Sequence, residues 1–228
     1  AELFVLCVGN DDDVRQVVTE ALPHIATGAV IVDHTTTSAR VAREMSGLAA
    51  EQGGAFLDAP VSGGQAGAEN GQLSVMVGGD AGALARAEPA LTTYSKAIKL
   101  MGPSGAGQLT KMVNQICIAG VVQGLAEAVH FAQAASLDTD AVYEAVSRGA
   151  AQSWQMDNRW KTMARGEFDF GFAVDWMRKD LGLVLDEARA NGSHLAVTAL
   201  VDQFYSEIQA MGGARWDTSS LAARLQAR

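Results

Sequence analysis

The stretch AVIVDHTTTSARVAREMSGLAAEQGGAFLDAPV, residues 29–61, decides the fold class of this chain. It opens and closes with short apolar runs, residues 29–33 and 55–61, which are typical of buried strands. Between them, residues 35–54 predict a helix that hydroxyl side chains cap and that two glycines end. A strand, a helix and a second strand in this order predict a parallel pair joined by a crossover helix.

The same alternation extends to both sides as far as Gly102. Strands are predicted at residues 2–8, 73–79 and 97–101, and helices at 10–22 and 81–95. No strand is predicted after Gly102, and helices are expected at 104–136, 138–149, 153–166, 175–192, 196–213 and 219–228. We therefore predict an α/β domain with a mostly parallel sheet at residues 1–103, followed by an all-α domain at residues 104–228 that a long helix opens.

Composition excludes several classes of protein. The 228 residues are 48% apolar and 19% charged, as in soluble globular proteins, and the net charge of −9 argues against a nucleic acid or an anionic membrane as the main partner. No apolar run reaches the roughly 18 residues of a membrane-spanning helix, and the first ten residues lack the basic start of a signal peptide. Cys7 and Cys117 lie in apolar segments, so we expect two separate buried thiols and a cytoplasmic protein.

The segment GAGQLTKMVNQ, residues 105–115, places a lysine at the start of an apolar helix. Residues 112–126 carry no charge, so Lys111 must find a partner or reach water. The spacing of three residues puts Lys111 and Asn114 on one helix face, where a lysine at a cavity rim can transfer a proton and an amide can hold an oxygen. On spacing alone, a lysine that reaches the surface past the helix start is the commoner interpretation.

Three other segments carry polar groups next to apolar runs. In DAPVSGG, residues 58–64, Ser62 and the backbone of Gly63 and Gly64 can approach an anion, or the glycines can simply make a turn. In VDHTTTS, residues 32–38, the hydroxyls can bind a polar ligand or cap the next helix. In WMRKDLG, residues 176–182, a solvent-side charge pair is the default interpretation. The chain contains no clustered metal ligands, no GxSxG, no Walker loop and no GxGxxG.

Four segments occur in order along the whole chain: DAPVSGG (58–64), GQLSVMVGGD (71–80), GAGQLTKMVNQ (105–115) and RKDLGL (178–183). Together they resemble the β-hydroxyacid dehydrogenase family, which includes 3-hydroxyisobutyrate dehydrogenase and tartronate semialdehyde reductase. The resemblance implies an NAD- or NADP-dependent oxidoreductase that interconverts a small 3-hydroxy acid and its semialdehyde. It also implies a Rossmann-type sheet followed by a helical substrate and dimerisation domain.

The resemblance assigns roles to particular residues. It implies that Lys111 is the catalytic general acid/base, that Asn114 lies beside it, and that the substrate carboxylate binds at three residues of one loop: Ser62, Gly63 and Gly64. The cofactor-contacting residues that it implies lie in three segments: Val8, Gly9 and Asp13 in a turn after an early strand, Thr36 near the nicotinamide ribose, and Lys179 in the helical domain. Many relatives read Leu-Pro where this chain reads Val8-Gly9, which is a departure from the pattern.

A second departure concerns the beginning of the chain. The family opens with a strand, a GxGxxG turn and a helix, whereas this chain begins at what resembles a later strand. We therefore expect a truncated or partly ordered chain, with an incomplete dinucleotide-binding domain at residues 1–103 and without the residue that separates NAD from NADP. The fragment alone is expected to be inactive.

Three alternatives stay open at this stage. Imine reductases share the architecture but generally replace the lysine, and phosphogluconate dehydrogenase follows its lysine with a His-Asn pair where this chain reads MVNQ. A non-catalytic scaffold that binds a protein partner is the third. We also expect a homo-oligomer, a dimer or a tetramer, because the long uncharged helix needs covering. Residues 150–160 are expected to line part of the pocket that selects the substrate's side chain.

Overall fold

The structure, a computed structural model, describes residues 1–226 and divides into two compact units, Ala1–Val113 and Asn114–Arg228. The division falls inside the long helix, later in the chain than the boundary near Pro103 that the composition suggested. Unit 1 is the α/β part and unit 2 is helical, so the predicted fold class is confirmed.

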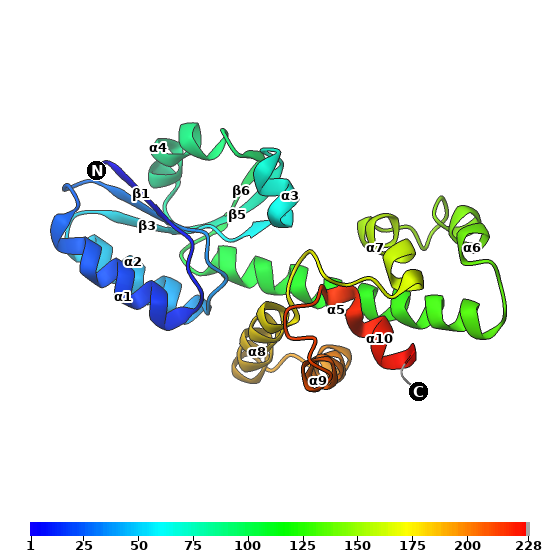
Figure 1. The fold of residues 1–228 in the computed structure, drawn as a ribbon. Coiled ribbons are helices and arrows are strands. Elements are labelled where there is room, and N and C mark those ends of the chain that lie inside the picture. Colours follow the sequence, from blue (N-terminus) through cyan, green and yellow to red (C-terminus); the bar gives the residue numbers. More distant parts are fainter. Residues whose placement is uncertain (227–228) are drawn as a thin grey trace. The chain divides into compact units, whose positions relative to one another are not determined.

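Unit 1 is built around a six-stranded sheet with helices on both faces (Figure 1). Its strands are β1 (Leu3–Leu6), β2 (Val30–Asp33), β3 (Ala55–Asp58), β4 (Val61–Ser62), β5 (Leu73–Gly78) and β6 (Ser95–Gly102). Its helices are α1 (Asp11–Ala21), the short 3-10 turn Leu22–His24, α2 (Ala39–Glu51), α3 (Gly64–Glu69), α4 (Ala81–Leu91) and the start of α5 (Ala106–Ala134).

The sheet is mostly parallel, as the alternation of strands and helices predicts. β1, β2 and β3 run parallel in register, so that Leu6, Asp33 and Asp58 lie side by side at their carboxyl ends. β5 and β6 form a second parallel pair, and an antiparallel pairing of β3 with β5 joins the two sets. The strands are covered on one face by α1 and α2 and on the other by α4, and each face has its own apolar core cluster.

Two local features of unit 1 differ from the sequence expectation. Residues 55–61 are not one uninterrupted strand: β3 ends at Asp58, and after Ala59 and Pro60 the two-residue β4 pairs with the same edge of β5 that β3 meets, because β6 occupies the other edge. Proline has no N–H to donate to a strand ladder, which explains a break at that point. The glycines after Ser62 are followed by the short helix α3, which the sequence interpretation of this loop, as an anion-binding backbone or a turn, did not include.

Unit 2 contains the rest of α5 and the helices α6 (Thr139–Val146), α7 (Trp154–Arg165), α8 (Val174–Asn191), α9 (Ala196–Ala210) and α10 (Leu221–Gln226), with a 3-10 turn at Thr218–Ser220. These helices share one apolar core, whose largest members are Trp160 and Tyr205. Met156 and Trp160, both inside the segment that was expected to line the substrate pocket, are core residues.

Helix α5 is long and apolar enough to span a membrane, although the sequence contains no uninterrupted apolar run of that length. In the described residues 1–226 it is the one helix that meets these two criteria. Ala119, Val122, Leu125 and Val129 of α5 are buried in the core of unit 2. We therefore interpret α5 as a core helix of the helical unit.

The two cysteines differ from the prediction, because both are exposed. Cys7 follows the edge strand β1, and Cys117 lies on the face of α5 that is turned away from the core. An apolar neighbourhood in sequence did not bury either thiol, because Cys7 lies just beyond the end of β1 and Cys117 lies on the outer face of α5.

Candidate active site

The site begins at the carboxyl ends of β1, β2 and β3. Because these strands are parallel and in register, the segments that follow them start from one edge of the sheet. Ligands of open α/β sheets bind at this edge. The segment after β1 carries Val8 and Gly9, the segment after β2 carries Thr36, and the segment after β3 leads to Ser62. Unit 1 thus places these sequence-predicted residues after the ends of three adjacent strands.

The turn after β1 is held by hydrogen bonds to its neighbours. The amide of Val8 donates to the hydroxyl of Thr35 at 2.9 Å, and the amide of Gly9 donates to a carboxylate oxygen of Asp13 at 3.1 Å. Asn10 caps α1 by accepting from the amides of Asp12 and Asp13. Of the predicted residues in this turn, Asp13 therefore acts within the turn itself, where it orders Gly9.

The edge at the carboxyl ends of β1, β2 and β3 suits the nicotinamide end of a dinucleotide better than its pyrophosphate. Thr36 and the backbone of Gly9 are hydrogen-bonding groups suited to a sugar or a carboxamide. The first turn of α1, however, carries three aspartates, Asp11, Asp12 and Asp13. An anionic pyrophosphate is disfavoured beside three carboxylates, even at a helix N-terminus. The residues present fit the nicotinamide and its ribose, and they do not fit the phosphates at this turn.

Asp58, at the end of β3, anchors the beginning of α5. Its two carboxylate oxygens accept from the amides of Gly105 at 2.7 Å and Gln108 at 3.0 Å. These are N–H groups that have no partner within the helix. Burial raises the pKa of the Asp58 carboxyl, against the opposing effect of these backbone donors. A side chain at Gly107 would lie 2.4 Å from the carbonyl oxygens of Asp58 and Met76, so only glycine allows this approach.

Lys111 lies in the second turn of α5, and its side chain is buried at 8% exposure. Its ammonium nitrogen donates to the carbonyl oxygen of Val61 at 2.8 Å. The sequence left open whether this lysine reaches the surface; in unit 1 it points instead at β4, one residue before Ser62. Lys111 and the Ser62 loop are therefore neighbours, as the predicted site requires.

The loop that follows Val61 depends on its two glycines. Gly63 has φ of 135° and Gly64 has φ of 61°, both in the region that favours glycine. A Cβ on Gly63 would lie 3.1 Å from a methyl group of Leu73, whereas nothing lies within 4 Å of one on Gly64. There is thus open space beside Gly64, whereas a side chain on Gly63 would crowd Leu73 of β5.

Gln108 is a site residue that the sequence analysis missed. Its side chain is fully buried, accepts from the amide of Thr37 at 3.0 Å and donates to the carbonyl oxygen of Thr35 at 2.8 Å. It ties the hydroxyl-rich segment after β2 to the first turn of α5. Its position three residues before Lys111 was visible in the sequence, but no pattern there indicated a partner more than 70 residues away.

The two remaining predicted residues, Asn114 and Lys179, belong to unit 2. Asn114 donates to the side-chain oxygen of Gln115 at 2.7 Å, and Gln115 donates to Asp180 at 2.6 Å. Lys179 lies 3.2 Å from the other oxygen of Asp180. The default interpretation of Lys179 and Asp180 as a solvent-side pair is wrong, because Asp180 is only 2% exposed. Its spacing of three and four residues from buried Met177 and Val184 was the signal for this.

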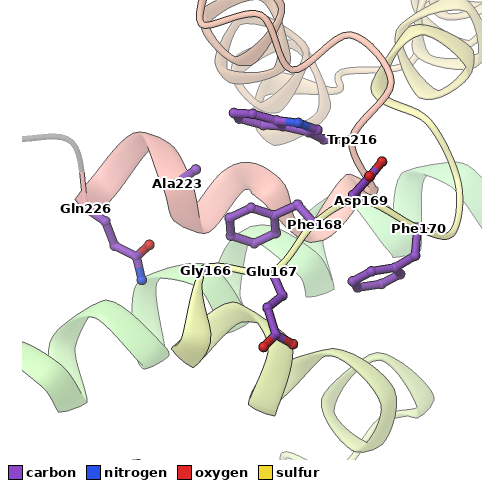
Figure 2. A pocket seen from close by; sticks show the side chains of 8 residues that line it. All are labelled: Gly166, Glu167, Phe168, Asp169, Phe170, Trp216, Ala223 and Gln226. Atoms are coloured by element: carbon purple, nitrogen blue, oxygen red, sulfur yellow. The ribbon is translucent and has the colours of Figure 1, made fainter.

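A hollow in unit 2 is lined by none of the sequence-predicted residues. It is surrounded by Gly166, Glu167, Phe168, Asp169, Phe170, Trp216, Ala223 and Gln226 (Figure 2). The rings of Phe168 and Trp216 pack on each other at its wall, and Glu167 is paired with Arg165. It is an open surface hollow without converging polar groups, so the motif residues remain the better candidate site.

Comparison with known proteins places both halves of the chain in one group of dehydrogenases. Residues 1–102 match the family described as the NAD binding domain of 6-phosphogluconate dehydrogenase. Residues 105–225 match the family described as NAD-binding of NADP-dependent 3-hydroxyisobutyrate dehydrogenase. The two matches cover the sheet and the helical part separately.

Individual relatives agree with these families. An uncharacterised oxidoreductase of Shewanella frigidimarina is 64% identical over 99% of this chain and 78% of its own length. The 2-hydroxy-3-oxopropionate reductase of Escherichia coli is 36% identical over 87% of this chain and 68% of its own. Among solved structures, the 3-hydroxyisobutyrate dehydrogenase of Mycobacterium tuberculosis with L-serine has a TM-score of 0.90 and 30% identity, covering 99% of this chain and 80% of that one.

Proposed function

The chain belongs to the β-hydroxyacid dehydrogenase family, and on that premise we propose that it is an oxidoreductase that interconverts a small 3-hydroxy acid and its semialdehyde. The observation that carries this proposal is the buried Lys111, whose ammonium lies 2.8 Å from Val61 beside the Ser62 loop. A buried lysine next to a loop of open backbone N–H groups suits a substrate with a carboxylate at one end and a hydroxyl near it.

In this proposal Lys111 is the general acid/base. It removes the proton of the substrate's hydroxyl during oxidation and returns it to the carbonyl oxygen during reduction. Burial supports the role, because the Lys111 nitrogen is shielded from water and can exchange a proton with a bound oxygen instead. Asn114, three residues further along α5, would hold the reacting oxygen or orient the ammonium.

The substrate's carboxylate is assigned to Ser62, Gly63 and Gly64. The Ser62 hydroxyl supplies one directed hydrogen bond, and Gly64 is exposed with nothing within 4 Å of an added Cβ, which leaves room for a ligand beside its backbone. The loop starts one residue after the carbonyl that holds Lys111. A short acid can therefore meet both groups at once, and water is kept from the lysine by the protein around it.

NAD or NADP, the cofactor of the matched families, supplies the hydride acceptor when bound. Val8, Gly9 and Thr36 are proposed to hold its nicotinamide side, with Asp13 ordering the turn through the amide of Gly9. The family resemblance also assigns a cofactor-binding role to Lys179, a residue of unit 2. We further infer that the protein works in the cytoplasm.

The proposed activity can be tested with the full-length product of the gene. The assay follows NADH or NADPH absorbance with 3-hydroxyisobutyrate, glycerate, serine and their methyl esters as substrates. Turnover of at least one acid, and much weaker turnover of its uncharged ester, is expected. Equal rates with acid and ester would rule out the anion pocket and favour an imine reductase. No cofactor-dependent turnover of any of these compounds would favour a non-catalytic scaffold.

We also propose that the protein assembles as a homodimer through unit 2. Residues 112–126 carry no charge, and Val121 and Phe131 of α5 are 38% and 71% exposed although the opposite face is core. A second copy offers the same uncharged face, as a two-fold interface requires. Phe131→Glu is expected to give monomers in light scattering, while Met101→Glu, an exposed change in unit 1, should not. A wild-type protein that is monomeric at micromolar concentration would contradict the proposal.

A further inference from the structure

Four polar side chains of unit 2 form a continuous chain that the proposed function leaves unexplained. Lys179 lies 3.2 Å from one oxygen of Asp180, and the NH2 group of Gln115 donates to the other at 2.6 Å. The NH2 group of Asn114 in turn donates to the side-chain oxygen of Gln115 at 2.7 Å. Gln115 and Asp180 are both only 2% exposed, so the middle of this chain is shielded from water.

The direction of these hydrogen bonds is set by Asp180. An ionised carboxylate accepts hydrogen bonds and cannot donate them, and the ammonium of Lys179 lies 3.2 Å from Asp180 as its ion-pair partner. Gln115 must therefore turn its NH2 group to Asp180, which leaves its carbonyl oxygen facing Asn114. Asn114 must then use its own NH2 group toward Gln115. Its carbonyl oxygen is thereby fixed as the acceptor end of the chain.

We propose that Asp180 is a positioning residue that, acting through Gln115, fixes Asn114 as a hydrogen-bond acceptor toward the reacting groups. The inference rests on the proposed function, in which Lys111, three residues before Asn114 on α5, carries the proton. An amide oxygen accepts from an ammonium or from a hydroxyl that gives up its proton. The NH2 end of the same amide would repel the ammonium, so the orientation decides whether Asn114 helps or hinders.

Packing alone does not account for an aspartate at this position. Met177, Leu181 and Val184 surround it on the buried face of α8. A leucine at position 180 would continue that apolar face, whereas a buried carboxylate costs free energy that its partners must offset. Gln115 likewise interrupts the apolar stretch of α5, and its NH2 group also lies 3.6 Å from the sulfur of Met177. Gln115 and Asp180 are therefore buried together, and Gln115 of this pair holds the side chain of Asn114.

The test exchanges the carboxylate between two positions of the full-length protein. Asp180→Asn lets the amide at position 180 turn either end to Gln115, so Asn114 loses its fixed orientation. We expect kcat to fall by up to about 100-fold with little change in KM, the size of effect that misplaced reacting groups produce. The added change Gln115→Glu puts a carboxylate beside Asn114 again, and it should restore most of kcat. Loss of packing or of the Lys179 pair would not be restored in this way.

The matched control is Asp202→Asn. Asp202 is also a buried aspartate of unit 2, with 8% exposure, and it pairs with Arg178 at 3.1 Å, away from Gln115. This change is expected to lower stability without lowering kcat. If Asp180→Asn keeps the wild-type kcat, or if the double change remains as slow as Asp180→Asn while both fold, the proposal is overturned. If Asp180→Asn fails to fold, Gln115→Met replaces it, with the same fall in kcat expected.

A second readout does not depend on catalysis. In 15N-labelled protein, the side-chain NH2 signals of Gln115 and Asn114 should be protected from exchange with water, and that protection should fall in Asp180→Asn. Unchanged protection would overturn the proposal even if wild-type protein proves inactive. A wild-type protein that turns over no hydroxy acid but shows the expected NH2 signals would instead support the arrangement and reject the proposed function.

Discussion

The ammonium nitrogen of Lys111 lies 2.8 Å from the carbonyl oxygen of Val61, fifty residues earlier in the chain. This bond joins the first turns of α5 to β4 and brings the lysine next to Ser62. It places the proposed proton carrier and the proposed carboxylate loop in one compact unit. The relationship is specific enough to be tested by changing either side.

Replacing Lys111 with alanine should abolish most of the proposed activity without unfolding the protein. Loss of a general acid/base typically lowers the rate by about 10²- to 10⁴-fold. The measurement is kcat of the full-length protein on its best hydroxy acid, with circular dichroism as the check on folding. Lys161→Ala, at a side chain that is 55% exposed, is the control and should keep full activity. A Lys111→Ala protein with near wild-type kcat would exclude the proposed role.

Substitutions in the loop at Ser62 should affect substrate binding at one position and protein stability at the next. Ser62→Ala removes one hydrogen bond, worth roughly 0.5–1.5 kcal/mol, and should raise KM several-fold with kcat little changed.

Gly63→Ala places a side chain at φ of 135° and 3.1 Å from Leu73, and should lower stability by about 1–3 kcal/mol. Gly64→Ala, at φ of 61° with open space, should cost less. Equal losses for the two glycines in denaturant unfolding would contradict this account.

Asp58 should matter more for stability than an ordinary helix cap. Its two oxygens hold the amides of Gly105 and Gln108, so Asp58→Asn leaves one amide facing an NH2 group. We expect a loss of about 1–2 kcal/mol at neutral pH. Asp80, which caps α4 through one oxygen at an exposed position, is the control, because Asp80→Asn keeps that acceptor. Urea unfolding of the two variants distinguishes them, and similar losses would be evidence against the double anchor.

His34 should make the stability of unit 1 depend on pH. Burial lowers the pKa of its imidazole, and its ring nitrogens lie 2.6 Å from the carbonyl oxygen of Ala59 and 2.9 Å from the hydroxyl of Tyr94. The carbonyl can only accept, so the neutral ring donates there and accepts from Tyr94. Because the folded-state pKa is lowered, His34 stabilises the fold above its ordinary pKa of 6.5 and ceases to do so as pH falls through the folded value.

The corresponding measurement is the melting temperature from pH 8 to pH 5. Wild-type protein should lose stability toward acid more steeply than His34→Gln, and Tyr94→Phe should lie between them because the ring keeps its carbonyl partner. Identical slopes for wild type and His34→Gln would show that the histidine is not buried as a neutral ring.

Local patterns in the sequence were sufficient for the elements and their order. Apolar runs, caps and terminal glycines predicted the strands at 29–33 and 73–79 and the helices of both units, because these signals act over a few residues. They also selected Lys111 and Ser62 as candidates. They did not predict the interruption between β3 and β4 at Ala59 and Pro60 or the helix after Gly63.

Tertiary structure alone decided which polar groups meet. Gln108 reaches Thr35 and Thr37 across more than 70 residues, and Asp180 is buried beside Gln115 although two charged residues precede it. The same holds for the exposure of Cys7 and Cys117, which apolar neighbours failed to predict. The physical reason is that burial and hydrogen-bond partners are set by packing between elements, whereas periodicity and capping are set within one element.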